Sequence, residues 1–184
     1  RVILDYGHNA AAIASISQLI DRLDVTGRRL CVVAAPGDRR DEDILAIAGE
    51  VAGHFDHYIC KADDHRRGRG DDEVPKMLRG QLLEAGVDED RIEVIPDEMQ
   101  AVNAALSMAR EGDLVVIFGD DIVRCWKQVA GHQVDGEDVP AGKPGKPVQG
   151  FVEPDPEAFT LEPGAELIRD ERGVRIARIE EESD

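Results

Sequence analysis

Arg1-Val-Ile-Leu-Asp-Tyr-Gly-His-Asn9 joins a short apolar run directly to a polar turn. The run at 2–4 has the length of a buried strand and is too short for a helix. Gly7 permits a tight turn, and Asn9 is a favoured N-cap for the alanine-rich segment that follows. The stretch therefore predicts strand, turn and helix, with polar side chains at the carboxyl end of the strand. That edge is where open α/β sheets bind ligands.

The polar residues of this turn have two readings. In the first, Asp5 and His8 bind a ligand, and the carboxylate orients the imidazole. In the second, Asp5 and His8 only satisfy loop backbone, and Asn9 only caps the helix. The spacing alone does not choose between them.

The same alternation of apolar strand and amphipathic helix continues along the chain. Strands are expected at 2–4, 30–35, 58–61, 92–95 and 114–118, and helices at 10–23, 41–51, 74–85, 98–109 with Asp97 as its cap, and 121–129. Five strands alternating with five helices predict a Rossmann-like α/β fold, a mostly parallel sheet with helices on both faces. The sequence carries neither the dinucleotide fingerprint after its first strand nor a P-loop.

The composition changes after residue 131. Prolines and glycines crowd residues 132–150, which predicts a linker. Residues 151–184 read as an irregular, acidic extension, in which the pattern at 165–168 and 173–179 is compatible with a β-hairpin. We therefore expect an α/β domain at 1–131, the linker, and this extension.

Charge and cysteine usage limit the classes of function. The chain has 184 residues, 42% of them apolar, and a net charge of −17, which argues against nucleic acid as a partner. No apolar run is long enough to span a membrane. Three widely spaced cysteines in apolar surroundings predict reduced core residues and a cytoplasmic protein. Because the chain begins within a strand and without methionine, we expect a fragment of a longer protein.

Charged residues follow three of the predicted strands at the same edge. Arg39 and Arg40 precede a helix, and two guanidiniums beside a helix N-terminus suit a phosphate or carboxylate. The alternative is that they pair with the acids at 41–43 on the surface. Asp120 and Asp121 follow the fifth strand, where they cap the next helix or meet a guanidinium.

The loop after the third strand mixes both signs of charge. Its acids Asp63 and Asp64 could hold a cationic group, and Arg66 and Arg67 could hold a carboxylate. The alternative is a solvated, charged loop. Trp126 lies on a helical stripe with Ile122 and Val129 and is expected in the core.

Three motifs resemble the C-terminal domain of the Mur ligase family. Asp5-Tyr-Gly-His-Asn9 resembles the Asp-Tyr-Ala-His-Asn-Pro signature that opens this domain, although Ala10 replaces the proline. Gly37-Asp-Arg-Arg-Asp-Glu-Asp43 and Asp120-Asp-Ile-Val-Arg-Cys-Trp-Lys-Gln128 look most like the cyanophycin synthetase branch. The resemblance covers roughly residues 1–131.

The resemblance implies a lid domain of an ATP-dependent ligase that forms amide bonds. ATP and Mg would be bound mainly by an upstream domain, and the partners would be that domain, an amino acid and an acidic peptide; in the cyanophycin branch the amino acid is arginine, joined to aspartate side chains. Asp5, His8 and Asn9 would face the nucleotide. Arg39 and Arg40, with His8, would serve catalysis, and Asp63, Asp64, Arg66 and Arg67 would hold the substrate. No metal ligand is expected in this chain.

Two other classes of function stay open. One is an inactive module, derived from such a ligase, that binds a polymer or a protein. The other is a fragment of a different α/β enzyme with an anion site. The sequence leaves the oligomeric state open, a homo-oligomer included.

Overall fold

The computed structural model describes residues 1–132 and, as backbone, the segments 165–170 and 173–178. By its contacts the chain forms two compact units, residues 1–136 and 137–184. The first unit contains ten regular elements besides a short 3-10 turn at Glu89–Arg91: β1 (Val2–Asp5), α1 (Ala10–Arg22), β2 (Arg29–Val33), α2 (Asp41–Val51), β3 (His57–Cys60), α3 (Glu73–Glu84), β4 (Ile92–Val94), α4 (Glu98–Met108), β5 (Leu114–Phe118) and α5 (Ile122–Gly131).

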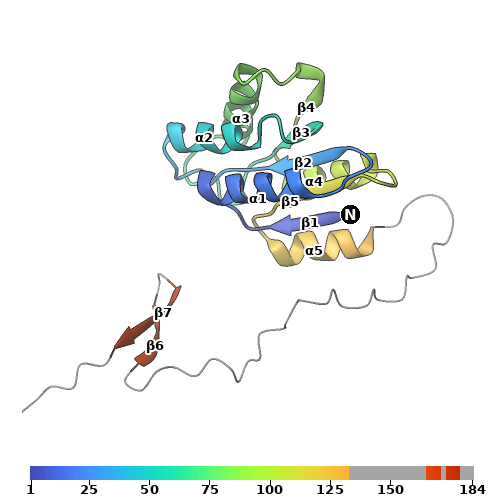
Figure 1. The fold of residues 1–184 in the computed structure, drawn as a ribbon. Coiled ribbons are helices and arrows are strands. Elements are labelled where there is room, and N and C mark those ends of the chain that lie inside the picture. The colour runs from blue at the N-terminus through green and yellow to red at the C-terminus, as the bar shows by residue number, and fades with distance from the viewer. Residues whose placement is uncertain (133–164, 171–172, 179–184) are drawn as a thin grey trace, which may run out of the picture. The chain divides into compact units, whose positions relative to one another are not determined.

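The five strands of this unit form one sheet in the order β1-β5-β2-β3-β4 (Figure 1). Every pairing is parallel, so the carboxyl ends of all five strands lie at one edge. The sheet and its alternation with helices confirm the predicted α/β class. Strand and helix boundaries agree with the sequence prediction to within two residues, and α2 and β5 match it at both ends.

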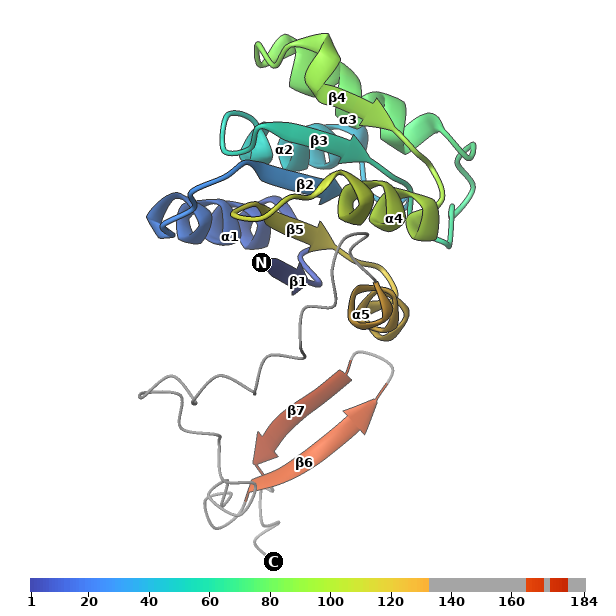
Figure 2. The ribbon, with the colours of Figure 1, turned by 90° about the vertical axis from the view of Figure 1, so that its right-hand side faces the viewer.

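Helices cover both faces of the sheet, and alternate residues of each strand divide between them (Figures 1 and 2). Cys31 and Val33 of β2 pack with α1, α2 and α3, whereas Leu30 and Val32 pack with α4. Such two-sided burial explains why the central strands are continuous apolar runs.

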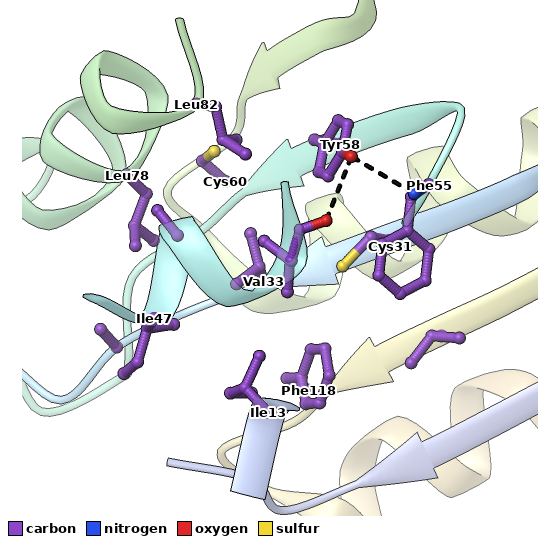
Figure 3. Packing of buried hydrophobic residues seen from close by; sticks show 14 of the residues in the cluster. Ile13, Cys31, Val33, Ile47, Phe55, Tyr58, Cys60, Leu78, Leu82 and Phe118 are labelled. Carbon is purple, nitrogen blue, oxygen red and sulfur yellow. Dashed lines mark hydrogen bonds between the residues drawn. The ribbon is translucent and has the colours of Figure 1, made fainter. Parts of the chain in front are cut away.

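A buried tyrosine forms hydrogen bonds with backbone groups of the turn between α2 and β3 (Figure 3). The Tyr58 hydroxyl donates to the Val51 carbonyl at 3.1 Å and accepts from the Phe55 amide at 3.3 Å and the Gly53 amide at 2.9 Å. These bonds let a polar atom lie inside the larger core cluster.

The three cysteines are free and buried, as the sequence predicted. Burial is the main cause that raises the pKa of Cys60 and of Cys125 to about 12, so both remain thiols at neutral pH.

The expectation for Trp126 was wrong, because this side chain is 61% exposed. Helix α5 turns only Cys125 fully toward the sheet. The neighbouring position along a helix points about 100° away, so the tryptophan faces outward with Val123.

The second unit contains an antiparallel pair, β6 (Ala165–Asp170) and β7 (Gly173–Arg178), with Leu167 opposite Ile176. This pair agrees with the hairpin pattern in the sequence. The predicted linker at 132–150 and the rest of the extension lie outside the described residues, apart from His132.

Within the described part of the chain, no helix has the length and apolarity to cross a bilayer.

Candidate functional site

Four loops enclose a pocket of about 210 Å³ at the carboxyl edge of the sheet. They follow β1, β2, β3 and β5. The lining residues are Tyr6, Gly7, His8, Ala34, Pro36, Arg39, Asp63, Arg67, Phe118, Gly119 and Asp120. The pocket therefore brings together His8, Arg39, Asp63 and Arg67 of the residues proposed from the sequence. Asp5, Asn9, Arg40, Asp64 and Arg66 are not among the lining residues.

The turn after β1 is fixed by its own polar groups. Asp5 Oδ1 accepts a hydrogen bond from the Gly7 amide at 2.6 Å, and Asn9 Oδ1 accepts from the Ala12 amide at 3.0 Å. A Cβ at position 7 would lie 2.9 Å from Asp5 Oδ1 and 3.3 Å from the Phe118 ring, which explains the glycine. Both Asp5 and Asn9 thus have structural roles in the turn.

His8 is oriented differently from the expectation. Its Nδ1 lies 3.2 Å from the Tyr6 carbonyl oxygen, and its ring is 5.6 Å from the Tyr6 ring. Asp5 Oδ1 accepts from the Gly7 amide, and Asp5 and His8 do not pair in this structure. The exposed Tyr6 and His8 rings instead form one wall of the pocket.

The two neighbouring arginines after β2 have different environments. Arg40 Nε and Nη2 each donate to the Asp43 carboxylate at 2.9 Å, and Arg40 also pairs with Glu42. Arg39 has no ion-pair partner among residues 1–132, and it lines the pocket. The surface-pairing reading therefore describes Arg40, while Arg39 keeps a free guanidinium at the sheet edge.

The arginines after β3 are partly committed to neighbours. Arg67 lines the pocket and pairs with Asp38 of the preceding loop, and this hydrogen bond lowers the pKa of Asp38. Arg67 adopts a φ of 51°, an uncommon conformation for a residue other than glycine. Arg66 Nε lies 3.3 Å from Asp71 Oδ1. Of the two, Arg67 is the one positioned to meet a ligand.

The two acids after β3 also differ. Asp63 lines the pocket with a side chain only 14% exposed, and burial raises its pKa. Asp64 Oδ2 instead lies 2.6 Å from Arg124 Nη1, and the Asp64 amide donates to Asp120 Oδ2 at 3.0 Å. Asp121 caps α5 by accepting from the Arg124 amide at 3.0 Å, as one reading of the sequence expected.

Arg69 organises the edge, although sequence reasoning treated it only as one of the charges of its loop. Its guanidinium donates to the Gly37 and Arg39 carbonyls, each at 2.8 Å, and to Asp41 Oδ1 at 2.7 Å and Glu73 Oε1 at 2.8 Å. These bonds join the loop that carries Arg39 to the loop that carries Arg67. The run of arginines at 66, 67 and 69 was the available signal, but it did not distinguish them.

Glu98 is a second residue that sequence reasoning missed. It lies in the first turn of α4, where an acid normally indicates only a favourable helix dipole, yet it is 2% exposed. Its carboxylate lies 2.8 Å from Nζ of the fully buried Lys61. No local pattern in the sequence predicts this ion pair, because 37 positions separate the two residues.

The pocket combines groups that suit a ligand with both signs of charge. Arg39 and Arg67 can hold a carboxylate or phosphate, while Asp63 and Asp120 can hold a cation. Toward a nucleotide, the arginines offer a contact to a phosphate, and the Tyr6 and His8 rings offer a contact to a ring of the ligand from one side. Among the described residues, no group of three His, Cys, Asp or Glu side chains could hold a metal ion.

The chain is similar in sequence to known ligases. Residues 1–120 match the family described as "Mur ligase, glutamate ligase domain". Cyanophycin synthetase from Nostoc sp. is 36% identical over 133 residues, covering 70% of this chain and 14% of the relative. A UDP-N-acetylmuramoyl-L-alanyl-D-glutamate–2,6-diaminopimelate ligase from Aquifex aeolicus is 29% identical, covering 64% and 23%. The chain thus spans only a small part of the relatives it matches.

Solved structures share the fold. The structure of a UDP-N-acetylmuramoyl-L-alanyl-D-glutamate–2,6-diaminopimelate ligase aligns with a TM-score of 0.55 at 19% identity, covering 70% of this chain and 29% of that one. E. coli FolC in complex with DHPP and ADP also aligns at 0.55, with 23% identity and coverage of 71% and 28%. At these sequence identities, the structural similarity shows a shared fold.

Proposed function

The chain belongs to the Mur ligase family, and from that premise we propose that it is the C-terminal lid domain of an ATP-dependent, amide-forming ligase. One observation carries the proposal. The strand-end motifs that match the family converge on a single pocket, in which Arg39, without an ion-pair partner among residues 1–132, shares the lining with Asp63 and Asp120. Such a pocket suits the closing of a lid over charged reactants.

The proposed reaction joins an amine to an activated carboxylate. ATP supplies the phosphoryl group that activates the carboxylate as an acyl phosphate. The neutral amine of an incoming amino acid then forms the bond to the carbonyl carbon, phosphate leaves with the electrons of the broken C–O bond, and the nitrogen releases one proton to solvent. The residues of this chain position the reactants and stabilise charge without forming a covalent bond.

The side chains take distinct parts in this proposal. Arg39 binds the phosphate or the acyl acceptor, because its guanidinium has no other partner within residues 1–132. His8 and the turn fixed by Asp5 and Asn9 face the nucleotide. Asp63 and Arg67 hold opposite ends of the amino acid. Arg40, Asp64 and Arg66 support these groups through the pairs they already form.

The substrate follows from the cyanophycin synthetase relative. We propose arginine as the amino acid, added to aspartate side chains of a peptide polymer. The carboxylates of Asp63 and Asp120 provide the acceptors that a guanidinium requires. ATP and Mg are bound mainly by an upstream domain of the complete ligase, which is the proposed partner.

The test is turnover by the complete ligase with Mg-ATP, arginine and an aspartate polymer. We expect ADP release that depends on both arginine and the polymer, together with a mass gain of one arginine residue, that is arginine less one water, per amide formed. Lysine and glutamate replace arginine in control reactions, and each should react more slowly. Binding of the polymer without any amide formation would instead identify an inactive binding module.

A further inference from the structure

The walls of the pocket after β3 and β5 are tied to one buried carboxylate. We propose that Glu98 is a positioning residue for the ligase reaction, which fixes these two loops through Arg124 and the backbone of 120–121. The inference rests on the proposed function, since it concerns the substrate pocket of that ligase. Glu98 itself does not line the pocket.

The carboxylate of Glu98 first holds the loop after β5. Oε2 accepts from the Asp120 amide at 2.7 Å, and Oε1 accepts from the Asp121 amide at 3.2 Å. Asp120 and the adjacent Gly119 line the pocket. The position of this wall is therefore set by bonds to an α4 side chain.

Through one arginine, Glu98 also holds the loop after β3. Arg124 Nη2 donates to Glu98 Oε1 at 2.5 Å, and Arg124 Nη1 lies 2.6 Å from Asp64 Oδ2. The Asp64 amide in turn donates to Asp120 Oδ2. Asp64 precedes the arginines of this loop and follows Asp63, so the connection reaches the residues that line the opposite wall.

Two cations, Lys61 and Arg124, form ion pairs with the buried carboxylate of Glu98 and offset the cost of its burial. Lys61 is fully buried, and its Nζ is 2.8 Å from Glu98 Oε2 and 3.9 Å from Asp63 Oδ1. Removing one member of such a cluster leaves an unpaired charge inside the protein. Glu98→Gln should therefore release both loops while α4 keeps its N-cap at Asp97.

The chain offers a matched control at the other end of the sheet. Asp113 is 4% exposed, accepts from the Arg28 and Arg110 amides at 2.7 and 3.0 Å, and pairs with Arg28 Nη2 at 2.7 Å. It precedes β5, whereas the pocket follows β5. Asp113→Asn thus removes an equivalent carboxylate charge away from the proposed site.

The first measurement is amide hydrogen exchange in the 184-residue chain. In Glu98→Gln, we expect exchange of the amides of Asp64, Asp120 and Asp121 to accelerate about tenfold or more, as for loss of one charged hydrogen bond. In Asp113→Asn, acceleration should appear at Arg28 and Arg110 instead. Arg124→Met is a second variant, because Arg124 is partly exposed and its loss should leave the fold intact.

The second measurement is steady-state turnover of the complete ligase carrying the same substitutions. We expect Glu98→Gln and Arg124→Met to raise KM for the amino acid about tenfold or more, with a smaller change in kcat. Asp113→Asn should leave both constants near the wild-type values. A loss of folded protein alone would lower kcat without changing KM.

The outcomes separate this inference from the proposed function. Unchanged exchange at Asp64 and Asp120 in both variants would overturn the inference, as would KM values equal to those of Asp113→Asn. A wild-type ligase that forms no amide would overturn the proposed function and, with it, the catalytic part of the inference. The exchange experiment would then still decide whether Glu98 holds the two loops.

Discussion

Arg39 and Arg40 are adjacent in the sequence but should contribute unequally to turnover. Arg39→Ala removes a guanidinium that lines the pocket and has no ion-pair partner among the residues up to 132, and we expect turnover of the complete ligase to fall by roughly 10²-fold, as for one electrostatic group in a transition state. Arg40→Ala removes a guanidinium that is bound to Asp43, so its effect should be several times smaller. Steady-state assays of the two variants measure the difference.

Arg110→Ala is the control for this pair, since Arg110 is exposed and precedes β5 at the opposite edge of the sheet. It should leave turnover unchanged. Equal losses at Arg39 and Arg40 would contradict the assignment, because they would show that the local pairing of Arg40 does not decide its role.

Glu98 should also give stability a measurable dependence on pH. Burial alone would raise the pKa of Glu98, but the positive charge of Lys61 in the ion pair and hydrogen bonds from the Asp120 amide and Arg124 lower it from 4.5 to about 2. An acid whose pKa is lower in the folded state stabilises that state above its unfolded pKa, and loses this effect as the pH falls through the folded value. From this group we expect a loss of roughly 3 kcal/mol between about pH 5 and pH 2.

Urea denaturation of wild type and Glu98→Gln across this pH range tests the expectation. The variant cannot titrate at position 98, so the difference in unfolding free energy between the two proteins should shrink toward acid pH. Comparing them at each pH cancels the contributions of the other carboxylates. A constant difference from neutral to acid pH would contradict a depressed pKa at Glu98.

At the residue scale, the sequence predicted the composition of the edge better than its contacts. The side chains that line the pocket come from predicted strand ends, because parallel strands all end at one edge. The sequence did not show that Asp64 is bound to Arg124. It also did not show that Glu98 is buried, as Asp113 is. These contacts join residues that are 26 to 60 positions apart and depend on how the loops approach.

At the start of α1, substitutions of Asn9 can separate a structural role from a ligand-binding role. Asn9 caps this helix, so Asn9→Ala should lower the free energy of unfolding by about 1 kcal/mol. Asn9→Ser keeps an acceptor for the Ala12 amide and should stay within a few tenths of a kcal/mol of wild type. Thermal or urea denaturation measures both changes.

Turnover of the same two variants then tests whether Asn9 also meets the nucleotide. If it does, Asn9→Ser lowers ligase activity while the chain keeps its stability. Activity that follows stability in both variants would restrict Asn9 to capping.

Elements were the scale at which sequence patterns predicted most. Apolar segments identified all five strands of the sheet, and the runs are longest in β2 and β5, which are buried on both faces. The failure was the outward face of α5, where a stripe of apolar residues at 122, 126 and 129 predicted burial. This helix follows β5 but packs against β1 at the end of the sheet, so it has fewer partners to cover it.

At the scale of the whole molecule, the strand order was not predictable from the chain alone. Each crossover is local, but the position of β5 between β1 and β2 depends on long-range pairing. That position brings the loops after β1, β2 and β5 together, and β3 beside β2 adds the fourth wall. The convergence at the edge was predicted, while the existence and size of the pocket were not.

The 184-residue chain should bind Mg-ATP only weakly. Most nucleotide affinity in P-loop enzymes comes from backbone amides and magnesium around the phosphates, and the sequence of this chain contains no P-loop. Asp5 already accepts from Gly7, and a single further hydrogen bond contributes roughly 0.5–3 kcal/mol. Even about 4 kcal/mol corresponds only to millimolar affinity, and the net charge of −17 repels the nucleotide.

Calorimetric titration of the chain with Mg-ATP measures this directly, with the complete ligase in the same buffer as the reference. We expect no saturable binding below the millimolar range for the chain, and tight binding for the ligase. Asp5→Ala should then weaken binding in the ligase, because it loosens the turn that faces the nucleotide. A micromolar dissociation constant for the chain alone would mean that its edge forms a complete nucleotide site, and a lid that depends on a partner domain would be the wrong description.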